Sequence, residues 1–233
     1  AVIATKDFPS DEFLMFATAQ GNVKKTSMDQ YDRTRRDGLI AINLKDGDEL
    51  ISVKRVAKGE KVIMVSSAGK AILWDESEAR AMGRGTMGVR GMNVPADAHV
   101  LGMEIAKPGT DLFVITEKGY GKRTKIEEYP EHHRGGQGVY TITMTHKKGL
   151  LSVMKIVGPD DEIMIVSEDG VIVRTPVKGI SELGRSTQGV KVMNVADKDK
   201  VCAVAIASTG KKKAKKAAPA DENQMGLLEE ESE

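Results

Sequence analysis

The chain has 233 residues, of which 40% are hydrophobic, so it is long and apolar enough to fold around a substantial core. Its 35 Lys and Arg residues nearly balance its 34 Asp and Glu residues, and no strong overall charge therefore indicates a polyanionic or membrane partner. The single cysteine, Cys202, excludes a disulfide framework and favours a reducing, cytoplasmic location, and the apolar runs are too short to cross a membrane.

The first ten residues precede the regular part of the sequence. They begin at Ala1 without an initiator Met, and they have neither the basic nor the apolar region of a signal peptide. We interpret residues 1–10 as the remnant of a preceding structural unit, with residues 1–5 as its last strand. The chain is therefore expected to be part of a longer protein.

Residues 11–206 contain four copies of one pattern. Each copy opens with an apolar run that is followed by a glycine turn and a basic residue; the runs are 13–16, 62–65, 112–115 and 163–166. A second glycine recurs at Gly38, Gly88, Gly138 and Gly189, at intervals of 50, 50 and 51 residues. A fixed period of this length is typical of repeat architectures.

Within each copy the apolar runs have the length and composition of strands, and glycines cut them at hairpin turns. A four-stranded unit of about 50 residues has the size of a propeller blade. We therefore predict an all-β, propeller-like array of four-stranded antiparallel blades. The unbroken apolar runs predict that the first strand of each blade is buried on both faces. Longer loops, at 26–37, 75–87, 125–137 and 176–188, are expected to join the second and third strands.

Basic residues recur in these loops and at the hairpins. One basic loop is usually only a solvated face, but four at the same repeat position predict a belt around the rim of the array. Glycines beside the cations would let a phosphate backbone approach main-chain N–H groups, as in DNA bound without base readout. The candidate DNA-binding residues are Lys24, Lys25, Arg33, Arg35, Arg36, Lys70, Arg80, Arg84, Arg90, Lys122, Arg123, Arg134, Gly135, Gly136, Gly138, Arg174, Arg185 and Lys191.

Other motifs are interpreted as coincidental. Residues 83–88 match the dinucleotide-binding pattern G-x-G-x-x-G, but no amphipathic helix follows them. Residues 121–124 resemble a phosphate-binding loop, yet Arg123 stands where a Ser or Thr would bind Mg²⁺. The four histidines lack the spacing of metal ligands, and no catalytic constellation is visible. We therefore predict no metal site and no catalytic residue.

The composition changes near residue 207. A lysine-rich stretch at 211–216 is followed by an acidic end at 229–233, with few apolar residues between them. Such composition cannot build a core, so residues 207–233 are predicted to be a disordered tail.

Several strings together resemble the C-terminal domain of the bacterial DNA gyrase A protein. They are residues 23–26, 81–84, 88–91, 119–124 and 184–190, and the similarity covers nearly all of residues 1–206. The resemblance implies a β-pinwheel, in which blades exchange strands, that wraps DNA around a basic perimeter. In gyrase, an A2B2 heterotetramer of gyrase A and gyrase B proteins, this wrap presents a DNA crossover for ATP-driven strand passage, which introduces negative supercoils.

The chain also departs from that family. The family usually has about six blades, whereas four copies are visible here, and the gyrase A box Gln-Arg-Arg-Gly-Gly-Lys-Gly has its nearest match in residues 133–138. The nucleophilic tyrosine domain and the ATPase are absent, so the chain alone is expected to be inactive and to bind no cofactor, while ATP and Mg²⁺ serve the rest of the enzyme. The corresponding protein of topoisomerase IV and a protein-binding propeller of the kelch or WD type stay as alternatives.

Overall fold

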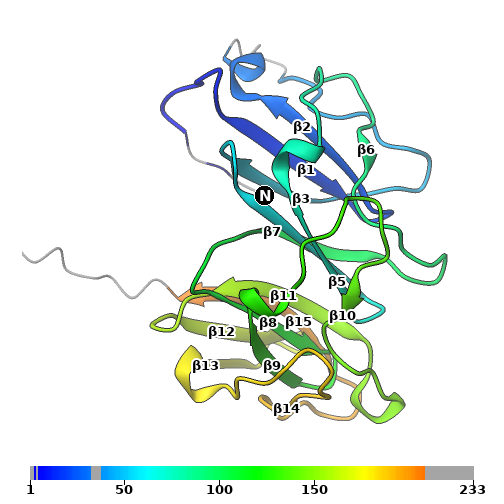
Figure 1. Ribbon diagram of the computed structural model, residues 1–233. Helices are drawn as coiled ribbons and strands as arrows, with labels where there is room; N and C mark the ends of the chain where they lie inside the picture. Colours follow the sequence, from blue (N-terminus) through cyan, green and yellow to red (C-terminus); the bar gives the residue numbers. More distant parts are fainter. Residues whose placement is uncertain (1–2, 4, 33–37, 208–233) are drawn as a thin grey trace, which may run out of the picture.

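The computed structural model describes residues 3, 5–32 and 38–207 of the chain. These residues form strands and short 3-10 helices, and they include no α-helix (Figure 1). No helical segment in this part of the chain has the length and apolarity needed to span a membrane. The strands are β1 (Phe13–Thr18), β2 (Asn22–Ser27), β3 (Leu50–Val56), β4 (Lys61–Ser66), β5 (Lys70–Asp75), β6 (Val89–Arg90), β7 (Val100–Ala106), β8 (Asp111–Thr116), β9 (Tyr120–Lys125), β10 (Val139–Tyr140), β11 (Leu151–Val157), β12 (Glu162–Ser167), β13 (Ile172–Pro176), β14 (Val190–Lys191) and β15 (Val201–Ala207).

Each copy begins with a hairpin at the predicted place. The hairpins are β1–β2, β4–β5, β8–β9 and β12–β13, and all of them are antiparallel. The first strand of each hairpin also pairs with a seven-residue strand, β3, β7, β11 or β15, which lies innermost in its blade. The apolar runs therefore become the middle strands of small antiparallel sheets.

The blades exchange strands. The first sheet has the order β3-β1-β2-β6, so its outermost strand comes from the second copy of the repeat. In the same way β10, from the third copy, completes the second sheet, and β14, from the fourth copy, completes the third. The predicted long loops thus lead to a third strand that belongs to the preceding blade, which is the exchange expected of a pinwheel.

The recurring second glycine makes this exchange possible. Gly88 and Gly138 have φ values of +83° and +71°, which side-chain-bearing residues rarely adopt. A Cβ atom on Gly88 would lie 2.2 Å from the carbonyl oxygen of Val23, and one on Gly138 would lie 2.2 Å from that of Ala71. The glycine therefore recurs because the exchanged strand must approach the backbone of the preceding blade.

The fourth blade differs from the prediction. Its sheet has only the three strands β13-β12-β15 among the described residues. Buried residues alternate with partly exposed ones along β12, whereas β8 is buried throughout. Burial on both faces was thus predicted correctly for β8 but wrongly for β12, because no described blade covers the outer face of β12.

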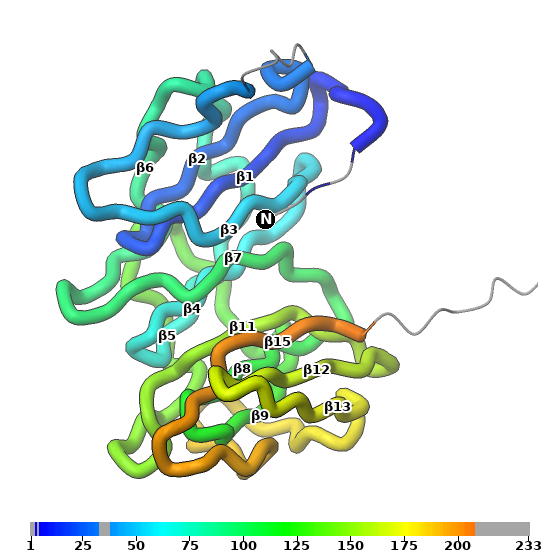
Figure 2. The backbone as a smooth tube through the Cα atoms, turned by 180° about the vertical axis from the view of Figure 1, so that it is seen from behind, coloured from blue at the N-terminus to red at the C-terminus, as the bar shows by residue number. Residues whose placement is uncertain are grey.

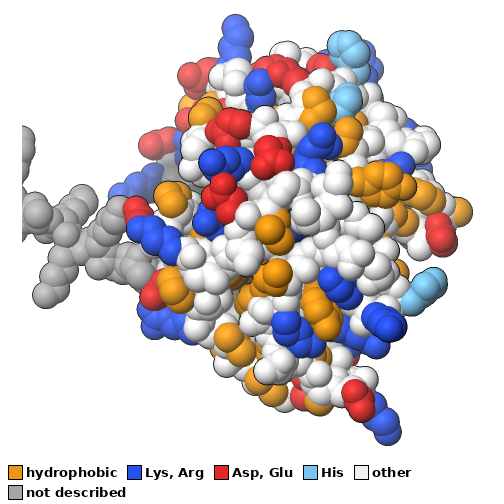
Figure 3. Space-filling model, turned by 60° about the horizontal axis from the view of Figure 1, so that its bottom comes forward, with side chains coloured by type: hydrophobic (Ala, Val, Ile, Leu, Met, Phe, Trp, Pro, Cys, Tyr) orange, Lys and Arg blue, Asp and Glu red, His pale blue; other side chains and the backbone are white. Residues whose placement is uncertain are grey.

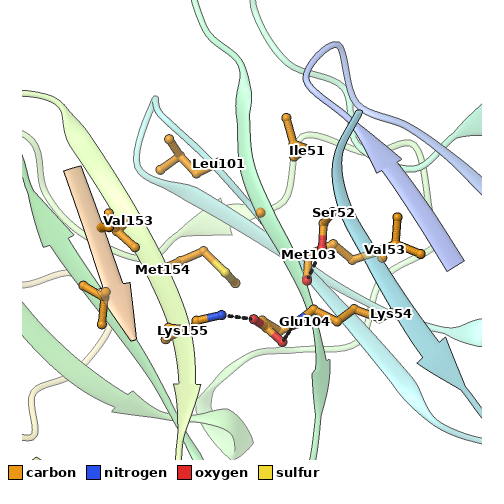
Figure 4. A pocket seen from close by; sticks show the side chains of 13 residues that line it. Ile51, Ser52, Val53, Lys54, Leu101, Met103, Glu104, Val153, Met154 and Lys155 are labelled. Atoms are coloured by element: carbon orange, nitrogen blue, oxygen red, sulfur yellow. Dashed lines mark hydrogen bonds and ion pairs between the residues drawn. The ribbon is translucent and has the colours of Figure 1, made fainter. Parts of the chain in front are cut away.

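Three hydrophobic clusters fill the spaces between consecutive blades. The innermost strands β3, β7 and β11 lie side by side and, with β15, line a pocket at the centre of the array (Figure 4). In this pocket the Glu104 carboxylate of β7 forms ion pairs with Lys54 of β3 at 2.6 Å and with Lys155 of β11 at 2.9 Å. The basic charges of the inner strands at this point are therefore neutralised within the protein.

The two end segments are only partly described. Residues 3 and 5–12 form no strand, and residues 1, 2 and 4 lie outside the described part of the chain. The predicted tail lies outside it from residue 208 onward. The assignments of residues 1–10 to a preceding blade and of residues 207–233 to a disordered tail therefore stay predictions.

Candidate nucleic-acid interface

Two of the candidate hairpin lysines are fully buried. Lys24 and Lys122 each have 0% exposure, and each ammonium group reaches the long loop of the next copy. Lys24 donates hydrogen bonds to the carbonyl oxygens of Ala41 and Arg84. The interpretation of Lys24 and Lys122 as DNA contacts is therefore wrong, since both ammonium groups already bind the protein's own oxygens.

Lys122 shows how such a lysine holds its loop. Its Nζ donates to the carbonyl oxygens of Gly184 at 2.6 Å and Arg185 at 2.9 Å, and it contacts Oγ1 of Thr187 at 3.1 Å. Burial lowers the pKa of Lys122 to about 8; nearby Glu128 opposes this shift and Arg185 adds to it. Burial also lowers the pKa of Lys24 to about 8, with Arg84 adding to the effect.

We expect the ammonium group of Lys122 to titrate near pH 8 in the folded chain, well below the ordinary lysine value of 10.5. Between these two pH values the unfolded chain binds more protons than the folded chain. The contribution of Lys122 to the free energy of unfolding is therefore fully present above pH 10.5 and is lost as the pH falls through about 8. NMR titration of labelled lysine side chains, assigned with Lys122→Met, measures this pKa; a value at or above 10.5 would contradict the prediction.

Three further candidates are held in ion pairs. Lys25 contacts the buried Glu76 carboxylate at 2.5 Å. Arg123 contacts carboxylates on two elements, Asp111 at 2.5 Å and Glu182 at 2.7 Å, and Arg174 pairs with Glu162. Lys25 and Arg123 are largely buried in these pairs, so we correct their assignment from DNA contacts to links within and between blades. Arg174 is 61% exposed, so its role in binding DNA stays a prediction.

The remaining described candidates form a different group. None of them makes an ion pair with a described carboxylate; they are Lys70, Arg80, Arg84, Arg90, Arg134, Arg185 and Lys191. The other three predicted arginines, Arg33, Arg35 and Arg36, lie outside the described residues. The structure therefore divides the predicted belt into cations that stabilise the fold and cations whose charge has no carboxylate partner.

The short exchanged strands bring several of these unpaired cations to the perimeter. Arg90 of β6 lies opposite Asn22, Tyr140 of β10 opposite Lys70, and Lys191 of β14 opposite Tyr120. Lys70 lies over the ring of Tyr140, 5.2 Å from its centroid, and Lys191 lies 4.5 Å from the centroid of Tyr120. A cation over an aromatic ring is favoured by the charge distribution of the ring.

Sequence reasoning missed one residue of this cluster. Lys148 lies 4.8 Å from the centroid of Tyr120, near Lys191, and forms no ion pair with a described residue. It belongs to the short helix η4 (His146–Lys148), which has no counterpart in the other described copies. A search for recurring positions could not find it, but the basic run 146–148 was a local signal. We call six side chains the outer rim: Lys70, Arg90, Tyr120, Tyr140, Lys148 and Lys191.

A space-filling view shows Lys and Arg side chains beside side chains of the hydrophobic class on one face (Figure 3). Such a surface can attract phosphate groups through its cations while the rings keep the cations in position.

The Arg-Gly-Gly sequence of residues 134–136 forms hydrogen bonds with the exchanged strand β6 and the residue after it. The guanidinium of Arg134 donates to the carbonyl oxygens of Glu78 at 2.9 Å and Arg90 at 3.0 Å, and the N–H of Gly135 donates to Gly91 at 2.6 Å. Gly136 is exposed, whereas Gly138 allows the exchanged strand to lie close to the backbone of Ala71. Arg134 therefore lies next to Arg90, but a role for residues 133–138 as a gyrase box stays a prediction.

The dinucleotide-like residues 83–88 are followed by strand β6, and residues 121–124 lie within β9. Among the described residues, neither segment leads into an α-helix whose N-terminus could bind a phosphate group; only the three-residue 3-10 helix η3 (Ile126–Glu128) follows β9. The interpretation of both as coincidental matches stays a prediction.

Comparison with known proteins then decides the family. A family model described as "DNA gyrase C-terminal domain, beta-propeller" matches residues 12–57, 60–107, 110–147 and 161–208. The chain belongs to this family. Its relatives include the DNA gyrase A protein of Salmonella typhimurium, 38% identical over 86% of the chain, and that of Mycobacterium tuberculosis, 37% identical over 88% of it. The chain spans 23% and 25% of the lengths of these two relatives.

Solved structures show the same gyrase-type fold. A DNA gyrase A C-terminal domain matches with a TM-score of 0.77 and 31% identity, covering 87% of this chain and 68% of that one. The C-terminal domain of DNA topoisomerase IV matches with a TM-score of 0.83 and 25% identity, covering 88% of this chain and 64% of that one. The resemblance to gyrase and the predicted pinwheel architecture are therefore both confirmed.

Proposed function

We propose that this gyrase-type domain binds duplex DNA through its phosphates and bends it around the outer rim. One observation carries the proposal: unpaired cations recur on the outer strands, while every Lys and Arg of the inner strands is ion-paired. The inner cations are Lys54, Arg55 and Lys155, and their partners are Glu104 and Glu12. Positive charge is thus left unneutralised on the perimeter and removed at the centre.

The recurrence of the rim cations favours recognition of the DNA phosphate backbone over recognition of the base sequence. Equivalent positions in successive blades can contact successive stretches of one phosphate backbone, and no groove-reading element is needed. The seven predicted candidates without a carboxylate partner and Lys148 together make eight rim and loop cations. If each contacts one phosphate, the slope of log K against log salt concentration is roughly −7. Bending a site of 20 to 30 bp costs on the order of 1 to 6 kcal/mol, which such distributed contacts can offset.

The proposal includes the setting in which wrapping is used. The domain acts as part of a cytoplasmic gyrase A protein that assembles with the gyrase B protein, where ATP-driven strand passage introduces negative supercoils. The chain supplies DNA binding and no chemical step. Topoisomerase IV is the second candidate source because its C-terminal domain matches with a TM-score of 0.83. Supercoiling by a gyrase whose own C-terminal domain is replaced by this chain would favour the gyrase origin.

Ligation of nicked plasmid in the presence of the chain tests wrapping. We expect the linking number of the closed circles to shift as protein is added, because chiral wrapping stores a crossing that ligation then traps. A variant with its rim cations replaced by Gln serves as the control and should give no shift. DNA binding without a shift would overturn wrapping and leave DNA holding. Salt-insensitive binding, or none at low salt, would overturn the whole proposal and favour a protein-binding propeller.

A further inference from the structure

Residues 83–86 and 184–187 occupy the same position in the second and fourth copies of the repeat, and we call them the two arginine loops. Their sequences are Gly-Arg-Gly-Thr and Gly-Arg-Ser-Thr. The guanidinium groups of Arg84 and Arg185 form no hydrogen bond or ion pair with a described residue. The two loops, which lie in different blades' surroundings along the chain (Figure 2), therefore each carry a cation that the described fold does not use.

In the first arginine loop all four main-chain carbonyl oxygens accept hydrogen bonds from the protein itself. That of Gly83 accepts from the Thr86 hydroxyl at 3.0 Å, and that of Arg84 accepts from the buried Lys24 ammonium group. The next two carbonyl oxygens accept from the side-chain amide of Asn43 at 2.9 Å and from its main-chain N–H at 3.1 Å. The acceptor groups of this loop are thus all occupied.

The second arginine loop has the same arrangement. Lys122 donates to its first two carbonyl oxygens, those of Gly184 at 2.6 Å and Arg185 at 2.9 Å. Thr143, which stands at the position of Asn43, donates to the last two, through its hydroxyl at 2.8 Å and its main-chain N–H at 3.0 Å. Two loops that are 101 residues apart in the sequence therefore have their carbonyl oxygens bound in the same way.

The main-chain N–H groups of the arginine loops have no such partners. Within the described part of the chain, no acceptor binds the N–H groups of residues 83–85 or 184–186. A Cβ atom on Gly83 or Gly85 would meet nothing within 4 Å, so the space beside these N–H groups is open. Consecutive free N–H groups next to a cation favour an anion, because a phosphate oxygen can accept from both.

The loop of the third copy shows the arrangement without a lysine. Ile72 occupies the position of the two buried lysines, and it is 0% exposed. Here the loop arginine itself holds the loop: the Arg134 guanidinium donates to the carbonyl oxygens of Glu78 and Arg90, and its N–H donates to the Glu78 carboxylate at 2.8 Å. A loop arginine is thus left without an internal partner only where a buried lysine holds the loop.

We propose that each arginine loop binds one phosphate group of the DNA backbone through its free N–H groups and its arginine, and that Lys24 and Lys122 are positioning residues for these contacts. The inference rests on the DNA binding proposed above. Each lysine binds carbonyl oxygens that would otherwise repel a phosphate group. It thereby leaves the N–H groups and the arginine of the loop available to the DNA.

Binding to linear duplex DNA over a salt series tests the proposal. Arg84→Gln combined with Arg185→Gln is expected to weaken binding by roughly 10-fold and to make the slope of log K against log salt concentration shallower by about 2. Lys24→Met combined with Lys122→Met is expected to change the slope equally, although neither lysine is exposed. An unchanged slope in either variant would overturn the role given to its residues.

A combined variant separates positioning from direct contact. Adding the two lysine changes to the arginine variant should make the slope no shallower, because the lysines act through the same two contacts. Additive changes would show that the lysines act elsewhere and would overturn their positioning role. The control is Lys61→Gln with Lys178→Gln, which removes the same charge from ion-paired positions and should leave the slope nearly unchanged.

A second measurement uses the wild-type chain and does not depend on how the variants fold. Adding linear duplex DNA at low salt should shift the main-chain amide resonances of residues 83–85 and 184–186 and the side-chain Nε–H resonances of Arg84 and Arg185. Shifts confined to other residues would overturn the two phosphate sites and leave DNA binding intact. No binding at low salt would overturn both this inference and the proposed function.

Discussion

Replacing Lys70, Arg90, Lys148 and Lys191 together with Gln is expected to weaken binding to linear duplex DNA by roughly 10²-fold to 10³-fold at about 0.15 M salt. Each lost phosphate contact removes the release of one counterion, so the slope of log K against log salt concentration should become shallower by about 3 to 4. All four side chains lack a carboxylate partner among the described residues, so the described fold loses no ion pair in the variant. Filter binding or fluorescence anisotropy over a salt series measures both quantities.

A control variant removes the same charge from other positions. Lys54, Lys61, Arg174 and Lys178 each form an ion pair with a carboxylate. Their replacement with Gln should change the salt slope by less than about one contact, and loss of the exposed ion pairs of Lys61, Arg174 and Lys178 should cost little stability. Equal losses of affinity in the two variants would show that only net charge matters and would remove the outer rim as the binding site.

The second large effect concerns the exchange of strands. Gly138→Ala is expected to lower the free energy of unfolding by roughly 3 kcal/mol, since the new Cβ combines an unfavourable positive φ with a backbone clash. That Cβ would lie 2.2 Å from the Ala71 carbonyl oxygen and 3.0 Å from the N atom of Ile72. Strand β10 would have to move, and Tyr140 would lose its place beside Lys70. Denaturant unfolding measures the stability change.

Gly109→Ala separates the two causes. Gly109 has a φ of +73°, nearly that of Gly138, but a Cβ there would meet nothing within 4 Å. It should therefore show only the cost of the left-handed conformation, about 1 to 2 kcal/mol. Equal destabilisation at Gly109 and Gly138 would show that close approach of the backbones plays no part in the repeated glycine.

The sequence alone was enough to predict the repeat, the hairpins and the family. Strands with alternating turns leave a local signal at each position, so the apolar runs and glycines located β1, β4, β8 and β12 correctly. The sequence did not show why the second glycine of each copy is needed. Gly138 was interpreted as a place where DNA approaches the backbone, yet the atom that approaches it is the carbonyl oxygen of Ala71.

The sequence could not distinguish the basic residues that stabilise the fold from those that are free to bind DNA. Lys24, Lys25, Lys70 and Lys191 are all lysines at recurring positions, and nothing in the pattern distinguishes them. Their roles depend on partners from other copies of the repeat, such as Glu76 for Lys25 and the carbonyl of Lys118 for Lys191. Lys148 was missed because it does not recur and comes close to Tyr120 only in the folded chain.

The sequence by itself therefore determined the elements, their order and the architecture, because hydrogen-bonded strands and tight turns depend on neighbouring residues. Tertiary structure decided which cations are free to bind DNA, since burial and ion pairing depend on groups brought together from different copies of the repeat. It also decided which blade each short outer strand joins. Strands β6, β10 and β14 each complete the sheet of the preceding blade, and only the pairing of strands from different copies shows this.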